Sequence, residues 1–395
     1  MADAALAATI TVNTAADDVI AGDGACTLRE ALINSNGDTE STSGDCVQGS
    51  GRDEIHFNIP GAGPHVISIS ASGGLPEIIA PVVIDGSTQP GNDSVCGAPI
   101  PDRPTYQVVL EDGALISSGV RFAAGSDGST IRGLNIRGFD DEQVDIASAS
   151  SIIIACNFLG SDETGTSQAA GNGNAISVFN GNSIFVGGTG PGNGNLLTAA
   201  SSGSSGISLT SAGANNSIQY NFIGTDKTGT LALPNEFGIL YFPQTGGQTQ
   251  ENFKISSNLI SGNAFAGVAF DTVDGLEMRR NLIGTDLTGT LPLGNGAQGI
   301  VAGFVSSGDS PAIIGGTGAS DGNTIAFNGA DGILVNDSPT TIQGNSIFSN
   351  GEQGIDLGND GPNINDGGDG DSGVNSLQNS PFLLPALAAK RNGEF

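Results

Sequence analysis

The residues best suited to chemistry lie in one short segment, FDTVDGLEMRR. It holds the carboxylates of Asp271, Asp274 and Glu277, followed closely by the cationic Arg279. Hydrolysis of a glycosidic bond needs two carboxyl groups about 5.5 Å or about 6.5–9.5 Å apart, whereas a lyase-type site combines a base with a cation that handles a uronate carboxylate. We therefore take Asp271, Asp274, Glu277 and Arg279 as candidate catalytic residues of a polysaccharide lyase or glycoside hydrolase. An exposed charged corner is the alternative interpretation of the same segment.

A second candidate site lies near the end of the chain, in the segment NDGGDGDSG. Asp366, Asp369 and Asp371 are separated there mainly by glycine. Closely spaced carboxylates with glycine between them can wrap a hard cation in oxygen ligands, so we expect these three residues to bind calcium. The segment lacks the bidentate glutamate of an EF-hand, and Asp360 or Asn363 would have to complete the site. A solvated acidic turn is the alternative.

The elements that must position these residues are indicated by an internal repeat. Asparagine followed by apolar residues recurs along the chain, and the distance from one such Asn to the next but one stays between 60 and 65 residues. The members of the series are Asn135, Asn157, Asn195, Asn221, Asn258, Asn281, Asn323 and Asn345. Short apolar stretches of period two separate Asn- and Gly-rich corners, which predicts short strands and no helical stripe. Three short strands with three corners make one coil of a parallel β-helix, in which each coil buries its aliphatic side chains against the next.

A phrase of the type GTDxTGT appears three times in this repeat, around Asp162, Asp226 and Asp286. It accounts for the longer intervals, so we interpret it as a loop extruded from one corner of alternate coils. Asp bonds neighbouring backbone groups in such a loop, as Thr does more weakly, and a turn-stabilising role follows. A stacked acidic row that binds cations or a ligand is the alternative.

The same architecture makes a further acidic segment, RGFDDEQVD, relevant to catalysis. Its carboxylates belong to Asp140, Asp141 and Glu142. Corners one coil apart in a β-helix can bring such residues together into a pair.

Charge and composition exclude several classes of partner. The chain has 12 basic residues against 41 acidic ones and a net charge of −29. Such a surface repels nucleic acid, and it disfavours polyanionic substrates unless a divalent cation bridges them. No stretch approaches the roughly 20 apolar residues of a membrane span, and the first residues are typical of a mature N-terminus behind an initiator Met. We expect a secreted protein that binds neither nucleic acid nor the membrane core.

Four cysteines are present, and none of them forms a CxxC motif. Their even number in an acidic, Lys-poor chain fits an oxidising compartment. The spacing favours a disulfide between Cys26 and Cys46 and leaves Cys96 and Cys156 as the second pair. Four reduced thiols remain the alternative.

The N-terminal end has a capping signal and a resemblance to a known family. Thr27 and Glu30 form a capping box that predicts a short helix from about Leu28 to Ser35, which would cover the first coil. The surrounding sequence, ITVNTAADDVIAGDGACTLREAL, resembles the N-terminal CSLREA motif of bacterial secreted and surface β-helix proteins, with Thr27 where the motif has Ser. The segment 354–383 is similar to the one that often closes such domains. The resemblance implies a right-handed, pectin-lyase-like parallel β-helix of about a dozen coils and an extracellular or cell-envelope location, without a settled activity.

These observations together give the predicted organisation and function. We expect an N-terminal cap over residues 1–50, a β-helix over residues 51–385, and a tail over residues 386–395 of the kind that vectors add. The favoured function is a secreted or cell-surface module with a structural, adhesive or ligand-presenting role, stabilised by calcium and binding a polysaccharide or another surface partner. The alternative is a polysaccharide lyase or glycoside hydrolase with its carboxylates in a groove along the coils. The acidic charge and the lack of the Gly-His-Gly signature of polygalacturonases favour the module.

Overall fold

The structure is a computed structural model of the whole chain, and it describes residues 7–378 apart from a few short gaps. The gaps are residues 71–72, 200–202, 243–250, 272, 274, 304–308, 337, 363, 366 and 369–372. Asp274, Asp366, Asp369, Asp371 and the tail 386–395 therefore lie outside the described residues.

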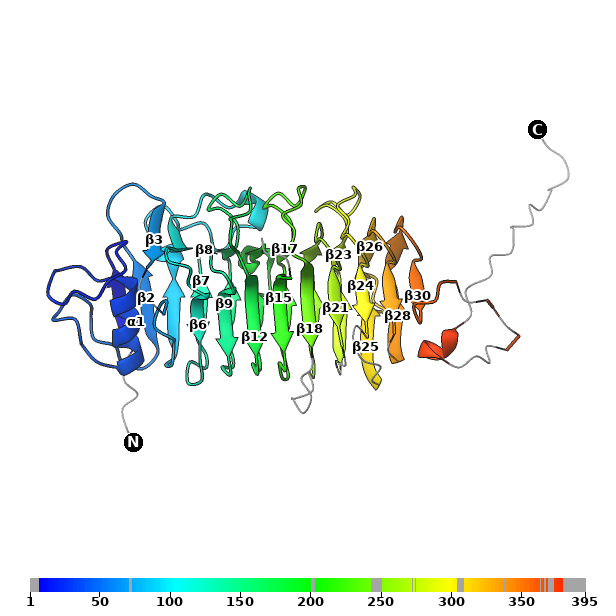
Figure 1. Cartoon of the computed structure of the whole chain (residues 1–395), viewed down its shortest axis with the longest axis horizontal. Helices are drawn as coiled ribbons and strands as arrows, with labels where there is room; N and C mark the ends of the chain where they lie inside the picture. Colours follow the sequence, from blue (N-terminus) through cyan, green and yellow to red (C-terminus); the bar gives the residue numbers. More distant parts are fainter. Residues whose placement is uncertain are drawn as a thin grey trace.

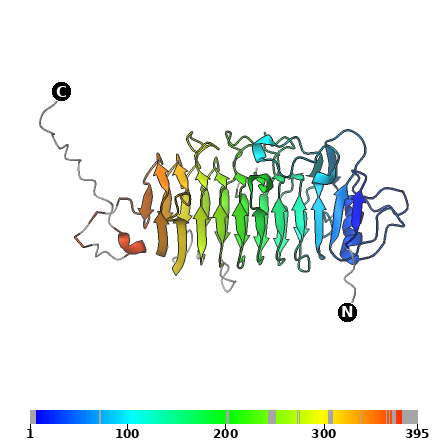
Figure 2. The same cartoon turned by 180° about the vertical axis from the view of Figure 1, so that it is seen from behind.

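The chain winds through three sheets in a repeating order, and all strand pairs within them are parallel (Figures 1 and 2). The first sheet has eleven strands: β1 (Thr9–Val12), β2 (Asp53–Phe57), β4 (Val82–Asp85), β7 (Thr130–Arg132), β10 (Ile153–Ala155), β13 (Phe185–Gly187), β16 (Ser217–Gln219), β19 (Lys254–Ser256), β22 (Leu276–Arg279), β25 (Asp309–Gly315) and β28 (Ser338–Gln343). The second sheet has ten: β3 (His65–Ile69), β5 (Val108–Asp112), β8 (Asn135–Arg137), β11 (Phe158–Leu159), β14 (Leu196–Leu197), β17 (Phe222–Ile223), β20 (Leu259–Ile260), β23 (Leu282–Ile283), β26 (Thr324–Ala326) and β29 (Ser346–Phe348). The third sheet has nine: β6 (Ser118–Phe122), β9 (Glu142–Ala147), β12 (Asn174–Phe179), β15 (Ser205–Thr210), β18 (Phe237–Phe242), β21 (Val268–Phe270), β24 (Ile300–Ala302), β27 (Ile333–Val335) and β30 (Ile355–Leu357). This arrangement is a right-handed parallel β-helix, as the sequence predicted.

One α-helix, α1 (Leu28–Gly37), and four short 3-10 helices complete the described elements. The 3-10 helices are η1 (Gly86–Thr88), η2 (Ile100–Asp102), η3 (Pro191–Asn193) and η4 (Val374–Leu377). Helix α1 lies at one end of the solenoid and η4 at the other (Figure 1). Within the described residues, no helix combines the length and apolarity that a bilayer crossing requires.

The core is a set of aliphatic columns that run along the solenoid axis. In the first sheet the inward position is occupied on consecutive strands by Ile, Val or Met, each at most 2% exposed: Ile10, Ile55, Ile84, Ile131, Ile154, Val186, Ile218, Ile255, Met278 and Ile314. Because each side chain packs against the coils on both sides, burial of one such residue stabilises the fold by about 1.5–3 kcal/mol.

The predicted asparagine series forms a hydrogen-bonded ladder at the corner between the first and second sheets. The side-chain oxygen of each Asn accepts from the backbone N–H and the side-chain amide of the Asn one coil earlier. The ladder contains Asn157, Asn195, Asn221, Asn258, Asn281, Asn323 and Asn345. Asn135 is one position out of register, because it pairs with Phe158 and its neighbour Leu134 donates its N–H to Asn157.

The ladder asparagines themselves do not adopt the left-handed conformation that turns the chain at this corner. The left-handed residue is the one before the ladder Asn on four coils, namely Cys156, Tyr220, Ser257 and Arg280, with φ between 47° and 60°. The ladder residues therefore act through their side chains, which satisfy corner N–H groups that have no strand partner. A second ladder, formed by Asn235, Asn263, Asn295, Asn328 and Asn350, lies at the corner between the second and third sheets.

The three GTDxTGT loops are held by their own aspartates, which confirms the turn interpretation. Asp162 accepts hydrogen bonds from the hydroxyls of Thr164 and Ser167 and from the N–H of Thr166, at 2.8–2.9 Å. Asp226 and Asp286 do the same in their loops. The loops also stack on one another, since the N–H of Lys227 donates to the carbonyl of Gly165 and the N–H of Leu287 donates to that of Gly229, at 2.8 and 3.0 Å.

The two predicted disulfides are both present. Cys26 joins Cys46 beside helix α1, whose capping box of Thr27 and Glu30 is also confirmed, and the helix runs two residues beyond its expected end. Cys96 joins Cys156 and fastens a long loop over the outer face of the second sheet. Val95, Ile100 and Tyr106 of this segment pack there against a row of side chains that lies outside the main core cluster. The row consists of Phe158, Leu196, Phe222 and Leu259 on the second sheet.

Candidate functional site

The structure separates the candidate catalytic residues of the FDTVDGLEMRR segment. Asp271 is 3% exposed and lies just after strand β21, whereas Glu277 and Arg279 lie partly exposed on strand β22. Asp274 is outside the described residues. The segment therefore does not present Asp271, Glu277 and Arg279 on one open surface.

Arg279 is paired with two nearby carboxylates. Its Nη1 lies 2.7 Å from Asp321 Oδ2, and its Nε lies 3.5 Å from Glu277 Oε2. Burial alone would raise the pKa of Asp321, but the N–H of Gly318 and the guanidinium groups of Arg280 and Arg279 hold it below its usual value. This arrangement matches the charged corner that was the alternative interpretation.

The predicted calcium ligands cannot be placed, because Asp366, Asp369 and Asp371 lie outside the described residues. Within the part of the chain that is described, no three His, Cys, Asp or Glu side chains are grouped so as to hold a metal ion.

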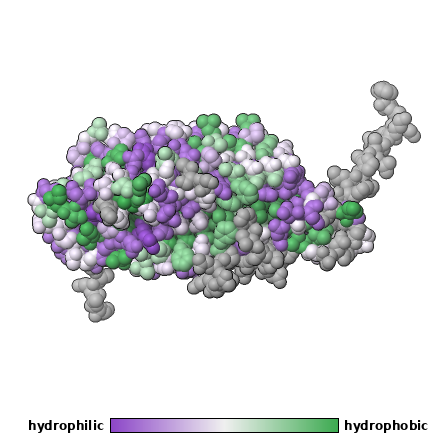
Figure 3. Space-filling model, in the orientation of Figure 1, coloured by the Kyte–Doolittle hydropathy of each residue, from purple (hydrophilic) through white to green (hydrophobic). Residues whose placement is uncertain are grey.

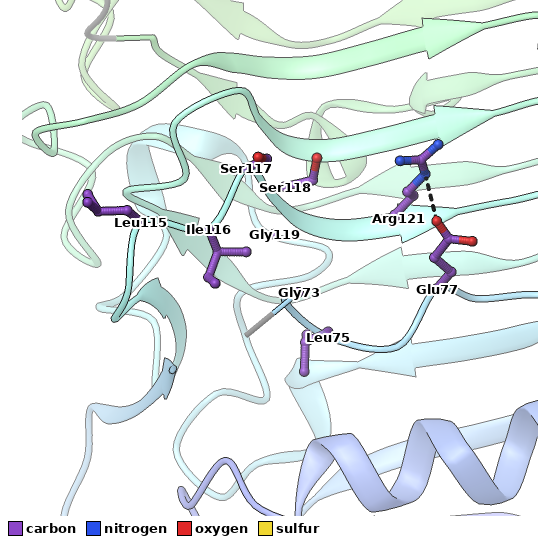
Figure 4. A pocket seen from close by; sticks show the side chains of 9 residues that line it. All are labelled: Gly73, Leu75, Glu77, Leu115, Ile116, Ser117, Ser118, Gly119 and Arg121. Carbon is purple, nitrogen blue, oxygen red and sulfur yellow. Dashed lines mark ion pairs between the residues drawn. The ribbon is translucent and has the colours of Figure 1, made fainter. Parts of the chain in front are cut away.

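The structure instead brings a different set of charged residues together at the N-terminal end of the third sheet. A cavity of about 230 Å³ opens beside strand β6 (Figure 4). Leu75 and Ile116 line one part of it, and Glu77 and Arg121 line another, pointing toward each other. In Figure 3, hydrophilic side chains gather over the N-terminal half of the face seen there, and a hydrophobic band lies near the middle.

Arg121 links the cavity to the next coil. Its Nε lies 3.3 Å from Glu77 Oε1 and 3.3 Å from Asp145 Oδ2, so a single guanidinium is shared by two carboxylates. On the same pair of strands, Ser118 Oγ donates a 2.9 Å hydrogen bond to Glu142 Oε2. The register explains these contacts, since Ser118 is paired with Glu142 and Arg121 with Asp145.

A local irregularity places both Glu142 and Asp145 on the outer side of strand β9. Residues three apart on a regular strand point to opposite faces, but Gln143 and Val144 are both buried here, which breaks the alternation. The break accompanies a close approach at Gly119, where an added Cβ would lie 2.6 Å from the carbonyl oxygen of Gln143. Strands β12 and β18 of the same sheet show the same break, so it is a recurring feature of the third sheet.

The electrostatics of the two carboxylates follow from burial and crowding. Burial raises the pKa of Glu142, and the charges of Asp145 and Asp141 raise it further against the opposing hydrogen bond from Ser118. Burial also raises the pKa of Asp145, an effect that Arg121 opposes and Glu77 reinforces. Raised carboxyl pKa values beside a cavity are typical of binding and catalytic sites.

Sequence reasoning found only part of this site. It singled out Asp140, Asp141 and Glu142 in the RGFDDEQVD segment but ranked FDTVDGLEMRR above it, and it missed Glu77, Ser118, Arg121 and Asp145. The one available signal was Asp145, which follows Glu142 in the same acidic segment.

Comparison with known proteins finds structural similarity at low identity and low TM-score. No protein-family model and no curated protein matches the chain. Among solved structures, the chain is similar to the periplasmic alginate epimerase AlgG, with 14% identity and a TM-score of 0.46 over 75% of this chain and 61% of that one. It is similar to pectate lyase Pel9A, with 12% identity and a TM-score of 0.38 over 97% of this chain and 90% of that one. It is also similar to PfbA, a surface adhesin of Streptococcus pneumoniae, with 12% identity and a TM-score of 0.33 over 72% and 71%.

These similarities are too low to assign the chain to a family or to a function. The chain spans less than two thirds of the alginate epimerase, and the matches include both enzymes and an adhesin. Function has to be argued from the chain's own side chains, because one fold hosts many activities.

Proposed function

We propose that this chain is a secreted or cell-envelope β-helix module that binds a glycan in the cavity beside Arg121. The observation that carries the proposal is the pairing of an apolar wall, Leu75 and Ile116, with a cluster of hydrogen-bonding charges around Arg121 in one cavity. A sugar ring has an apolar C–H face and a rim of hydroxyl groups, so it is complementary to such a lining.

The contacts of Arg279 argue against catalysis in the FDTVDGLEMRR segment, and so favour a protein that binds a glycan without cleaving it there. A cation that handles a substrate carboxylate must be free to approach it, but Arg279 already bridges Asp321 and Glu277. Asp271 is buried. Both features fit a structural role for that segment.

The extracellular assignment rests on the cysteines. Two disulfides tie separate parts of the solenoid together, and such bonds persist in oxidising compartments. Together with the CSLREA-like N-terminal segment, they support a bacterial secreted or surface protein.

The test is a binding screen of the purified chain against a panel of defined oligosaccharides. Binding of at least one member should weaken on substitution Arg121→Gln, because the shared guanidinium positions both Glu77 and Asp145. The matched control is Lys254→Gln, a charge removed from an exposed position on strand β19. Equal loss in both variants, or no binding to any glycan, would refute the proposal.

A second candidate function, glycoside hydrolysis, is favoured by the raised pKa values of Glu142 and Asp145. Both carboxyl groups lie on the outer side of strand β9, and glycoside hydrolysis uses a pair of carboxyl groups. Release of new reducing ends that is abolished in both Glu142→Gln and Asp145→Asn would establish this function in place of binding alone.

A further inference from the structure

We infer that the group bound in the cavity carries a positive charge, and that the glycan is one with free amino groups rather than a uronate. This inference rests on the proposed glycan-binding function and names the chemical class of its ligand.

Negatively charged side chains outnumber positively charged ones around the cavity. Arg121 is surrounded by Glu77, which lines the cavity with it, and by Asp145, which shares its guanidinium. Glu142 lies close by through its bond to Ser118, and Asp141 is near enough to act on Glu142 electrostatically. Four carboxylates therefore lie around the guanidinium of Arg121. A second guanidinium, that of Arg29, bonds the carbonyl of Gly74 beside the cavity and is already paired with Asp17.

An anionic sugar would meet this cluster unfavourably. To pair with Arg121, a uronate would have to displace Glu77 or Asp145 and then sit beside the carboxylate that it displaced. The net charge of −29 adds long-range repulsion of the same sign.

An ammonium group fits the same cluster without breaking any contact. The side chain of Glu77 is 55% exposed and that of Asp145 is 13% exposed, so Glu77 is the carboxylate with free surface toward a ligand. An ammonium bound to its outer oxygen would add a second positive charge to a site with excess negative charge. Ser117 and Ser118 lie on the cavity wall, and the Ser118 hydroxyl, which already donates to Glu142, can still accept a hydrogen bond from a ring hydroxyl of the same ligand.

The size of the cavity limits the ligand to a single sugar residue. Its 230 Å³ is below the roughly 300–1,000 Å³ of sites that enclose a drug-sized molecule. Leu75 and Ile116 offer an apolar surface for one face of a pyranose ring. The ligand is therefore a terminal or single amino-sugar residue, with the remainder of the glycan outside the cavity.

The experiment compares four probes by calorimetric titration at pH 6 and low salt. The probes are oligoglucosamine with free amino groups, the same oligomer fully N-acetylated, oligogalacturonate, and a linear aliphatic diamine that carries the charge without the sugar. We expect oligoglucosamine to bind about tenfold or more tightly than its N-acetylated form, because acetylation removes the ammonium charge. Oligogalacturonate should bind least.

Variants connect the result to the cavity. Glu77→Gln should weaken oligoglucosamine binding about tenfold, since it removes the accessible charge and keeps the shape. Glu54→Gln is the matched control, because the Glu54 side chain is 48% exposed on strand β2 and pairs with His56. Asp145→Asn serves as the second variant of the cluster and should weaken binding in the same direction.

The outcomes separate the inference from the proposed function. Equal affinity for the acetylated oligomer, or tighter binding of oligogalacturonate, would overturn the charge inference and leave glycan binding intact. Binding of the diamine as tightly as oligoglucosamine would overturn the saccharide class. If no saccharide binds, both the inference and the proposed function are wrong.

Discussion

Asn258 and Asn281 occupy the same corner on successive coils, and a single side-chain oxygen joins them. Oδ1 of Asn281 accepts from the backbone N–H of Asn258 at 3.0 Å and from its Nδ2 at 3.1 Å. Asn258 repeats the arrangement with Asn221 and also donates to the carbonyl of Ile218 at 2.9 Å. Each Asn in the middle of the ladder thus forms hydrogen bonds with the coils on both sides, so the corner contains a continuous buried network of hydrogen bonds.

Replacing Asn258 by alanine should cost about 3 kcal/mol of unfolding free energy. The substitution leaves the N–H of Asn221 and the carbonyl of Ile218 buried without these partners, at about 1–3 kcal/mol for each orphaned group. Urea denaturation measures the change. Asn345→Ala at the end of the ladder is the control, because Asn345 is partly exposed and water can replace its bonds. Equal losses at both positions would show that burial of the ladder contributes nothing.

Removing the Cys96–Cys156 disulfide should destabilise the protein more than removing Cys26–Cys46. The first closes a sequence separation of 60 residues and the second one of 20. The loop-closure entropy predicts about 4 kcal/mol for the longer loop and about 3 kcal/mol for the shorter one. Thermal unfolding of the two double Cys→Ser variants tests the order. The reverse order would indicate that the packing of the loop, and not its closure, dominates.

Asp286→Asn should destabilise the protein at neutral pH and have little effect in strong acid. Burial raises the pKa of Asp286, but hydrogen bonds from Thr288, Leu291 and Thr290 outweigh it and lower the pKa below its usual 3.8. The ionised carboxylate therefore stabilises the fold above about pH 4, and this contribution is lost as the pH falls through the lowered pKa. Chemical denaturation at pH 7 should show a loss of about 1–3 kcal/mol that disappears near pH 2. A loss that does not depend on pH would contradict the role of the charge.

Glu142→Gln should have the opposite pH dependence. Burial and the charges of Asp145 and Asp141 raise the pKa of Glu142 above its usual 4.5, so the folded state keeps the proton at pH values where the unfolded state has lost it. The ionised group therefore opposes folding at pH 7, and its cost fades as the pH falls toward the unfolded value. The variant should melt above the native protein at pH 7, with the difference absent at pH 4. A lower melting temperature at pH 7 would mean that the bond from Ser118 outweighs the repulsion.

Calcium should raise the melting temperature if Asp366, Asp369 and Asp371 form the predicted site. Ion binding to the folded state alone stabilises it in proportion to the logarithm of the free ion concentration. Melting with calcium and with a chelator measures the shift, and Asp366→Asn with Asp369→Asn should abolish it. A melting temperature that the chelator leaves unchanged would remove these residues from the list of metal ligands.

Most of the architecture could be predicted from the sequence, because the features that build it are repeated. The spacing of the asparagines indicated the length of the coils. Asn side chains can bond from one coil to the next only if an Asn recurs at the same position on each coil. The capping box indicated helix α1 because it is a local motif of four residues. The cysteine pairs followed from their number and spacing. Asn135 was assigned wrongly because a shift of one residue, to Leu134, is invisible in an interval that varies from coil to coil.

The sequence by itself determined the parallel β-helix, its acidic surface and its oxidised cysteines, since each depends on composition or on a period that any part of the chain displays. Only the tertiary structure decided where charges meet. Glu77, Arg121 and Asp145 lie on separate passes of the chain, and loop length and register bring them within 3.3 Å contacts. The break in the alternation of strand β9 turns Glu142 and Asp145 to the same side. The face of the sheet on which a side chain lies depends on the backbone geometry between coils. The pattern of residue types in the sequence does not determine that geometry.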